Sequence, residues 1–193
     1  MTLEVEVKYA VADPARLVAE LASRGVHLGE IQQQQDRYFR HPVRDFAQTD
    51  EALRIRTVGG VSQLTYKGPK LDQTTKSRHE IELALRDPHV EDALAEMLEL
   101  LGFQHEAVVQ KSRREGELQF ADRTIVIAVD ELEELGTFLE LETKADSFEL
   151  DDARNAVLQL ADELRLSASE RRSYLELMLE RRPSRSPRAP DSP

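Results

Sequence analysis

Two segments of this sequence carry charged side chains at every second position. Glu4-Val5-Glu6-Val7-Lys8 lies near the start, and Glu140-Leu141-Glu142-Thr143-Lys144 repeats its spacing much later. Side chains of a β-strand alternate between its two faces, so each segment would present two carboxylates and an ammonium on one face. The pattern indicates a sheet with an apolar face that packs on a core and a charged face that is available for chemistry.

Further charged residues between these segments follow the same alternation. The basic group consists of Lys8, Arg54, Arg56, Lys67, Lys76, Arg78, Lys111 and Arg113. The acidic group consists of Glu4, Glu6, Glu80, Glu82, Asp130, Glu140 and Glu142. If the strands close into a barrel around these charges, the interior must be hydrated or filled by a polyanion, because unpaired buried charges are costly. The alternative is an ordinary antiparallel sheet with one solvated face and cross-strand ion pairs.

The charged interior would suit a polyphosphate that carries a metal ion. Arginine binds two phosphate oxygens at once, and lysine acts as a point charge. Clustered carboxylates suit a hard divalent cation such as Mg²⁺ or Mn²⁺. Other catalytic schemes have less support, because the five histidines lack metal-ligand spacing and the sequence has no nucleophile elbow, P-loop or dinucleotide-binding motif.

The composition excludes several other classes of protein. The chain has 193 residues, 33% of them charged and 40% hydrophobic, as expected for one globular domain. A net charge of −11 argues against a nucleic-acid-binding protein, which needs a basic surface. No apolar run is long enough to span a membrane, and no secretory signal is evident. The sequence lacks cysteine, which excludes disulfides. We therefore expect a cytoplasmic protein.

The spacing of apolar and turn residues predicts the order of the elements. Strands or extended segments are expected at 2–9, 27–40, 51–58, 61–68, 76–85, 104–116, 117–121, 123–130 and 136–144, with a loop at 41–50. Helices are expected from Asp13 to Gly25, from Asp87 to Gly102, at 151–164 and at 168–181. Gly59-Gly60 predicts a tight hairpin turn. Short strands joined by hairpins favour an antiparallel sheet, closed into a barrel.

Taken together, the motifs resemble the CYTH superfamily, the triphosphate tunnel metalloenzymes. They are the ExExK motif Glu4-Val5-Glu6-Val7-Lys8, then Asp36-Arg37-Tyr38-Phe39, Leu53-Arg54-Ile55-Arg56, Leu64-Thr65-Tyr66-Lys67-Gly68-Pro69, the strand from Lys76 to Glu82, Lys111 with Arg113, Asp130, and Glu140 with Glu142. The resemblance implies an α+β fold, an eight-stranded antiparallel β-barrel with flanking helices that forms a triphosphate tunnel. Residues 1–182 would form this domain, and the Arg/Ser/Pro-rich residues 183–193 a disordered tail.

The resemblance also implies roles for the charged residues. The metal ligands would be Glu4, Glu6, Glu80, Asp130, Glu140 and Glu142, binding Mg²⁺ or Mn²⁺. The triphosphate would be bound by Lys8, Arg54, Arg56, Lys67, Lys76, Arg78, Lys111 and Arg113. The residues expected to take part in catalysis are Glu4, Glu6, Lys8 and Glu142.

The resemblance leaves the activity open among enzymes that share this site. The segments Thr65-Tyr66-Lys67-Gly68-Pro69-Lys70 and Arg172-Ser173-Tyr174-Leu175-Glu176-Leu177 look similar to class IV adenylyl cyclases, which convert ATP to cyclic AMP and pyrophosphate. For the second segment, core packing of a helix is an equal alternative. The other candidates are a triphosphatase acting on tripolyphosphate or thiamine triphosphate, and a non-catalytic sensor of nucleotides or polyphosphate. A homodimer is left open.

Overall fold

The computed structural model describes residues 2–71, 74–85 and 90–181. The strands are β1 (Thr2–Val11), β2 (Gln32–Arg40), β3 (Ala52–Val58), β4 (Val61–Lys67), β5 (Glu80–Leu85), β6 (Gln104–Phe120), β7 (Arg123–Leu132) and β8 (Gly136–Asp146). The helices are α1 (Pro14–Ser23), α2 (Phe46–Thr49), α3 (Val90–Leu100), α4 (Leu150–Glu163) and α5 (Tyr174–Arg181). The tail expected at 183–193 lies outside the described residues.

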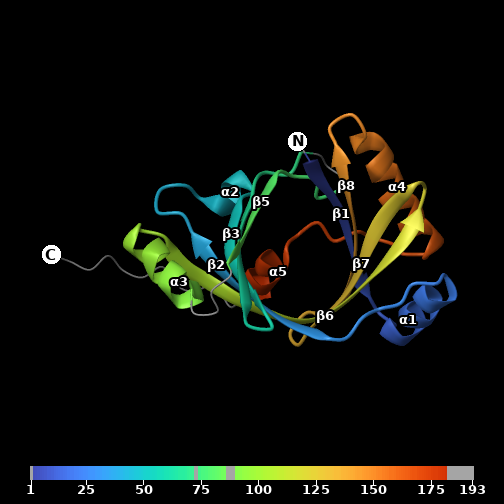
Figure 1. Ribbon diagram of the computed structural model, residues 1–193, viewed down its shortest axis with the longest axis horizontal. Helices are drawn as coiled ribbons and strands as arrows, with labels where there is room; N and C mark the ends of the chain where they lie inside the picture. Colours follow the sequence, from blue (N-terminus) through green and yellow to red (C-terminus); the bar gives the residue numbers. More distant parts are fainter. Residues whose placement is uncertain (1, 72–73, 86–89, 182–193) are drawn as a thin grey trace.

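All eight strands belong to one antiparallel sheet in the order β1-β8-β7-β6-β2-β3-β4-β5. The sheet curls into a half-barrel, with β5 and β1 on either side of the opening and α5 inside the curve (Figure 1). The α+β class and the eight antiparallel strands expected from the sequence are confirmed.

In the part of the chain that is described, the barrel expected from the resemblance is not closed by strand pairing between β1 and β5, the first and last strands in the order of the sheet. Within the described residues, β5 pairs with β4 and forms no ladder with β1. Short segments cover the free edge of β1 instead. The Lys76 amide donates to the Glu6 carbonyl at 2.8 Å, and the Glu170 amide donates to the Lys8 carbonyl. Single bridges also pair Glu4 with Arg78 and Tyr9 with Ser169. The curl is therefore held by backbone hydrogen bonds from two loops.

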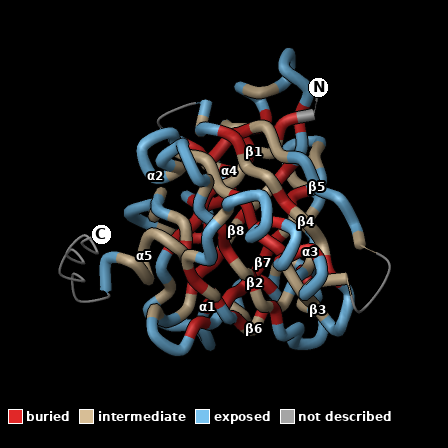
Figure 2. Tube along the Cα trace, turned by 90° about the vertical axis from the view of Figure 1, so that its left-hand side faces the viewer, coloured by how far each residue is buried: buried red, intermediate tan, exposed pale blue. Residues whose placement is uncertain are grey.

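Three apolar clusters surround the sheet. The first joins the outer face of β1, β7 and β8 to α1 and α4 and contains the fully buried Val5, Ile127, Leu141 and Leu160. The second packs α3 against β2 and β3. The third lies on the concave side, where α5 packs on β6 and β8. Buried residues follow the strands while turns and outer helix faces are exposed (Figure 2). Every described helix is too short or too polar to cross a membrane.

Several local predictions are confirmed. The Asp13 side chain accepts a hydrogen bond from the Arg16 amide at 3.0 Å and so caps α1, with Pro14 in its first turn. Gly59 and Gly60 both adopt positive φ, at 56° and 81°, as the tight turn between β3 and β4 requires.

Four local predictions are wrong. The loop expected at 41–50 contains α2, which Asp45 caps through the Ala47 amide. The strands expected at 104–116 and 117–121 are one strand, β6. The strand expected from residue 76 begins at Glu80, because the preceding backbone bonds to β1. The helix expected from residue 168 begins at Tyr174, because the residues before it lie along β1.

Candidate functional site

The concave side of the sheet encloses a cavity of about 800 Å³. Its lining includes the site residues Glu4, Glu6, Lys8, Arg54, Arg56, Lys67, Lys76, Arg78, Glu80, Lys111, Arg113, Glu140 and Glu142. Residues from seven segments of the chain thus meet in one place, because alternation points every second side chain of each strand inward. The further predicted residue, Asp130, is fully buried behind this lining.

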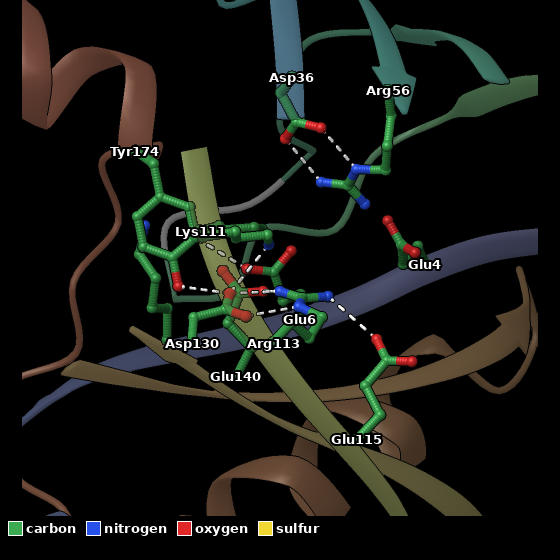
Figure 3. A network of polar contacts seen from close by, with 12 residues as sticks. Glu4, Glu6, Asp36, Arg56, Lys111, Arg113, Glu115, Asp130, Glu140 and Tyr174 are labelled. Carbon is green, nitrogen blue, oxygen red and sulfur yellow. Dashed lines mark hydrogen bonds and ion pairs between the residues drawn. The ribbon is translucent and has the colours of Figure 1, made fainter. Parts of the chain in front are cut away.

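Asp36 holds two of the basic residues on the β2–β3 side. Its carboxylate accepts hydrogen bonds from Arg56 at 2.6 and 2.7 Å and from Arg54 at 3.1 Å (Figure 3). Burial alone would raise the pKa of Asp36, but the charges of Arg54 and Arg56 outweigh it and hold this pKa well below its usual range. Asp36 is therefore an anion that fixes both guanidinium groups at the cavity wall.

Asp130 plays the same part on the β6–β7 side. Its carboxylate accepts from Lys111 Nζ at 2.9 Å, from Arg113 Nε at 2.5 Å and from the Tyr174 hydroxyl at 2.9 Å. Arg113 also binds Glu140, whose own pKa is kept low by Arg113 and Lys111 against the effect of burial (Figure 3). With both oxygens engaged by three donors, Asp130 orients the cations around it.

Lys8 lies beneath α5 and is 1% exposed. Its ammonium donates to the Arg172 carbonyl at 2.6 Å and lies 3.9 Å from the centroid of the Tyr174 ring. Burial, reinforced by the nearby charge of Lys76, lowers the pKa of Lys8 to about 7. Lys8 can therefore gain or lose its proton near neutral pH, and an incoming anion would favour the charged form.

The remaining lysines pair with carboxylates along the β1 and β5 rims. Lys76 donates to Glu6 at 2.8 Å. Lys67 binds Glu80 and lies 3.6 Å from Glu4. These pairs span the gap between β5 and β1, so they join the two edges of the half-barrel by charge as well as by backbone hydrogen bonds.

The carboxyl groups of Glu4 on β1, Glu80 on β5 and Glu142 on β8 lie next to one another. The Glu80 and Glu142 carboxyls both contact that of Glu4. Burial and the neighbouring Glu4 raise the pKa of Glu80 and of Glu142, while the Lys67 charge lowers that of Glu4 against the effect of burial. A cation bound among these carboxyls would favour their charged forms and so oppose the effect of burial on the pKa of Glu80 and of Glu142.

This donor set fits a hard divalent cation in its chemistry, because all of its donors are carboxylate oxygens. Over the part of the chain that the structure describes, no group of three or more His, Cys, Asp or Glu side chains is arranged so that it could hold a metal ion by itself. Mg²⁺ commonly takes one or two carboxylates and completes its shell with water and substrate phosphate. Glu4 and Glu142 can supply these one or two carboxylate ligands.

Sequence reasoning did not assign a role in the site to Asp36 or Tyr174. The structure places Tyr174 both in the third apolar cluster and against Asp130, so core packing and contact with the site are combined in one side chain. The position of Asp36, two residues before Tyr38 on the same strand, indicates that its side chain lies on the face of Tyr38. Which arginines Asp36 binds depends on the pairing register of β2 and β3, which the sequence alone does not give.

Fold and cavity together define a curled antiparallel sheet that surrounds a charged binding site. The family model described as CYTH domain matches residues 2–174, and the chain belongs to this family. CYTH proteins bind triphosphates and in general depend on a divalent metal.

Several known proteins are similar to this chain. A protein of Methanocaldococcus jannaschii named "putative adenylate cyclase" is 35% identical over 178 residues, which cover 91% of this chain and 98% of that protein. A solved structure from Pyrococcus horikoshii OT3 is 37% identical with a TM-score of 0.83, covering 93% of this chain and 99% of that one. A Hippeastrum protein, described as a "putative adenylyl cyclase" with a dominant triphosphatase activity, shares the fold at 16% identity and a TM-score of 0.64, covering 93% of this chain and 96% of that one.

Proposed function

We propose that this protein is a divalent-metal-dependent enzyme that acts on a triphosphate, and that it is an adenylyl cyclase converting ATP to cyclic AMP and pyrophosphate. The observation that carries the proposal is that basic side chains converge on one cavity, which three neighbouring carboxylate side chains also line. These are Glu4, Glu80 and Glu142. The similarity to the Methanocaldococcus jannaschii protein supports the choice of ATP.

The basic residues would bind the phosphate chain from two sides. Arg54 and Arg56 face it from β3, and Lys111 and Arg113 from β6. Arginine and lysine contacts neutralise the charge of three phosphates and hold the chain in one orientation. Asp36 and Asp130 would position these cations, and we propose this supporting role for Asp130 instead of the metal-ligand role that the resemblance implies.

The carboxylates would hold the cation at the other side of the phosphate chain. Glu4 and Glu142 are its proposed ligands, with Glu6, Glu80 and Glu140 close by. When bound, a divalent cation supplies neutralisation of the charge that develops on the phosphate oxygens. Lys8 would lie over the reacting phosphate as a cation whose pKa near 7 rises when the anion binds.

A cyclase and a hydrolase would use these same contacts and differ in the nucleophile. In the cyclase, the ribose 3′-oxygen attacks the α-phosphorus, the bond from that phosphorus to the α–β bridging oxygen breaks, pyrophosphate leaves, and the hydroxyl proton passes to water. In the hydrolase, water attacks the terminal phosphorus, the bond from that phosphorus to its bridging oxygen breaks, and the diphosphate leaves while the attacked phosphorus becomes orthophosphate. A triphosphatase is our second candidate, because the fold of this chain also occurs in the Hippeastrum protein to which that activity is ascribed.

A product assay tests the proposal. The full chain is incubated with Mg²⁺ or Mn²⁺ and, separately, with ATP, tripolyphosphate and thiamine triphosphate, and the products are separated by chromatography. Cyclic AMP with equimolar pyrophosphate is the expected result. Orthophosphate without a cyclic product would make the protein a triphosphatase. Binding without any product would make it a sensor and contradict the proposal.

A further inference from the structure

Residues 169–173, which we call the strap, lie between α4 and α5 and run along β1 (Figure 1). The strap contacts Lys8 twice. The Glu170 amide donates to the Lys8 carbonyl at 2.6 Å, and the Arg172 carbonyl accepts from the Lys8 ammonium at 2.6 Å. The bridge between Tyr9 and Ser169 continues this contact by one residue. The strap therefore fixes both the main chain and the side chain of Lys8.

The Glu170 carboxylate holds Arg172 in place. Its Oε1 accepts from the Arg172 amide at 2.9 Å and from Arg172 Nε at 2.8 Å, and its Oε2 accepts from Nη2 of the same guanidinium. These hydrogen bonds lower the pKa of Glu170 to about 2, so Glu170 is an anion at neutral pH. A carboxylate that binds both the amide and the guanidinium of one residue restricts the backbone there. Glu170 thus determines where the Arg172 carbonyl points.

The strap is also fixed at its far end, where α5 begins. The Ser173 amide donates to the Glu176 carboxylate at 2.6 Å, and the Glu176 amide donates to Ser173 Oγ at 3.1 Å. These two reciprocal bonds form a capping box, which holds the first turn of a helix. The remaining guanidinium nitrogen of Arg172 donates to Glu180 on α5 at 2.6 Å. The segment Arg172-Ser173-Tyr174-Leu175-Glu176-Leu177 therefore joins the strap rigidly to α5.

The Lys8 ammonium has a defined place as a result. The Arg172 carbonyl takes one of its three N–H groups, and the rings of Tyr174 and Phe138 lie 3.9 and 5.5 Å from it. A lysine side chain otherwise has high rotamer freedom, which it loses when it binds an anion. A lysine that is already oriented loses less on binding and so binds the anion more tightly.

We propose that Glu170 is a positioning residue for triphosphate binding, which acts through Arg172 to aim the Lys8 ammonium at the phosphate chain. The inference rests on the proposed function, in which Lys8 lies over the reacting phosphate. Glu170 is not among the residues that line the cavity, so its effect on the ligand must pass through Lys8. An ion pair that only stabilised the fold would change the free energy of unfolding and leave Lys8 where it is.

Nuclear magnetic resonance of the full chain with isotope-labelled lysine reports the place of Lys8. Protons above an aromatic ring are shifted upfield, so the methylene next to the Lys8 ammonium should resonate apart from those of exposed lysines. Lys8→Met identifies this signal by removing it. Glu170→Gln keeps the shape of the side chain and loses its charge, and it should move the signal toward those of exposed lysines.

Calorimetric titration with tripolyphosphate, in buffer with EDTA, reports the consequence for binding. Loss of a hydrogen bond to a charged group leads us to expect that Lys8→Met weakens binding at least about 10-fold and Glu170→Gln about 5-fold. The double variant should bind no more weakly than Lys8→Met alone, because two changes that act through one side chain are not additive.

Glu20→Gln is the matched control. Glu20 forms an exposed ion pair with Arg24 at 3.1 Å on α1 and does not line the cavity, so this change should alter neither measurement. Arg172→Lys keeps the test decisive if Glu170→Gln does not fold. Lysine retains the charge but lacks the two-pronged contact with Glu170, so the same two effects are expected.

The outcomes separate the inference from the proposed function. An unchanged Lys8 signal or an unchanged tripolyphosphate affinity in the folded Glu170→Gln or Arg172→Lys variant would overturn the inference alone. So would a double variant that binds more weakly than Lys8→Met by the full factor of Glu170→Gln. A wild-type protein that binds no tripolyphosphate would refute the proposed function, and the inference with it.

Discussion

Replacing Asp36 by Asn removes the negative charge that two arginines share inside the half-barrel. Asp36 is 1% exposed, and its oxygens accept from Arg54 at 3.1 Å and from Arg56 at 2.6 and 2.7 Å. Loss of one partner of a buried ion pair costs about 3–5 kcal/mol, because the remaining charge stays buried without compensation. For a domain of this size, that cost corresponds to a fall in Tm of about 6–20 °C.

Thermal unfolding followed by circular dichroism at neutral pH measures this effect. Tripolyphosphate should restore part of the lost stability, because its oxygens offer Arg54 and Arg56 another anion. Asp151→Asn is the control. It breaks an ion pair with Arg154 at 2.7 Å whose Asp151 side chain is 87% exposed, so the free energy of unfolding should change by less than about 0.5 kcal/mol.

The pH dependence of the same variant provides a second test. Since the pKa of Asp36 is held below its unfolded value, its contribution to stability is present above the unfolded pKa of about 3.9 and is lost as pH falls through the folded pKa. The difference in Tm between wild type and Asp36→Asn should therefore shrink as the solution is acidified below about pH 4. An Asn variant that melts within about 2 °C of wild type at neutral pH would refute the reasoning.

Three further predictions concern the site. Glu6→Gln should lower metal-dependent turnover about 10- to 100-fold with an unchanged circular dichroism spectrum, and wild-type turnover would remove Glu6 from the site. Because Lys8 has a pKa of about 7, it is charged below that pH, so tripolyphosphate affinity measured by calorimetry should fall as pH rises from about 6 to about 8. Lys8→Arg, which stays charged over this range, should make that dependence shallower, and an unaltered slope would contradict the assignment. Tyr174→Phe loses the hydrogen bond to Asp130 and should cost about 1 kcal/mol of unfolding free energy in urea titrations, whereas no change would show that this bond is dispensable.

The sequence alone sufficed for the features that depend on neighbouring residues. Alternation along each strand predicts that Glu4, Glu6 and Lys8 share a face, and the structure lines the cavity with all three. The Gly59-Gly60 turn follows from a backbone requirement for positive φ that glycine meets readily.

Features that depend on contacts between distant segments could not be predicted. The sequence predicts separate strands before and after the end of residue 116, yet β6 continues through Gly116. A Cβ atom at that position would lie 2.8 Å from the His27 carbonyl oxygen, so glycine is required there because another segment crosses closely. The residues before Tyr174 have helical spacing, but Ser169 and Glu170 bond to the edge of β1. Tertiary hydrogen bonds prevail over local preference there.

The ion pairs within the site also depend on contacts between distant segments of the chain. The spacing of Arg54 and Arg56 indicates a basic face, but their link to Asp36 depends on the register in which Asp36 lies opposite Arg56. Asp130 likewise lies opposite Arg113 in the β6–β7 ladder. Sequence reasoning therefore identifies which residues are charged and face inward, and the sheet register decides which of them support the others.

Anomalous diffraction at the manganese edge, from crystals of the full chain grown with Mn²⁺ and tripolyphosphate, tests the central claim most directly. We predict a manganese peak inside the half-barrel, bound by Glu4 or Glu142 and by phosphate oxygens, with the phosphates contacting Arg54, Arg56 and Arg113. Manganese and tripolyphosphate bound only outside this cavity would contradict the assignment of the site.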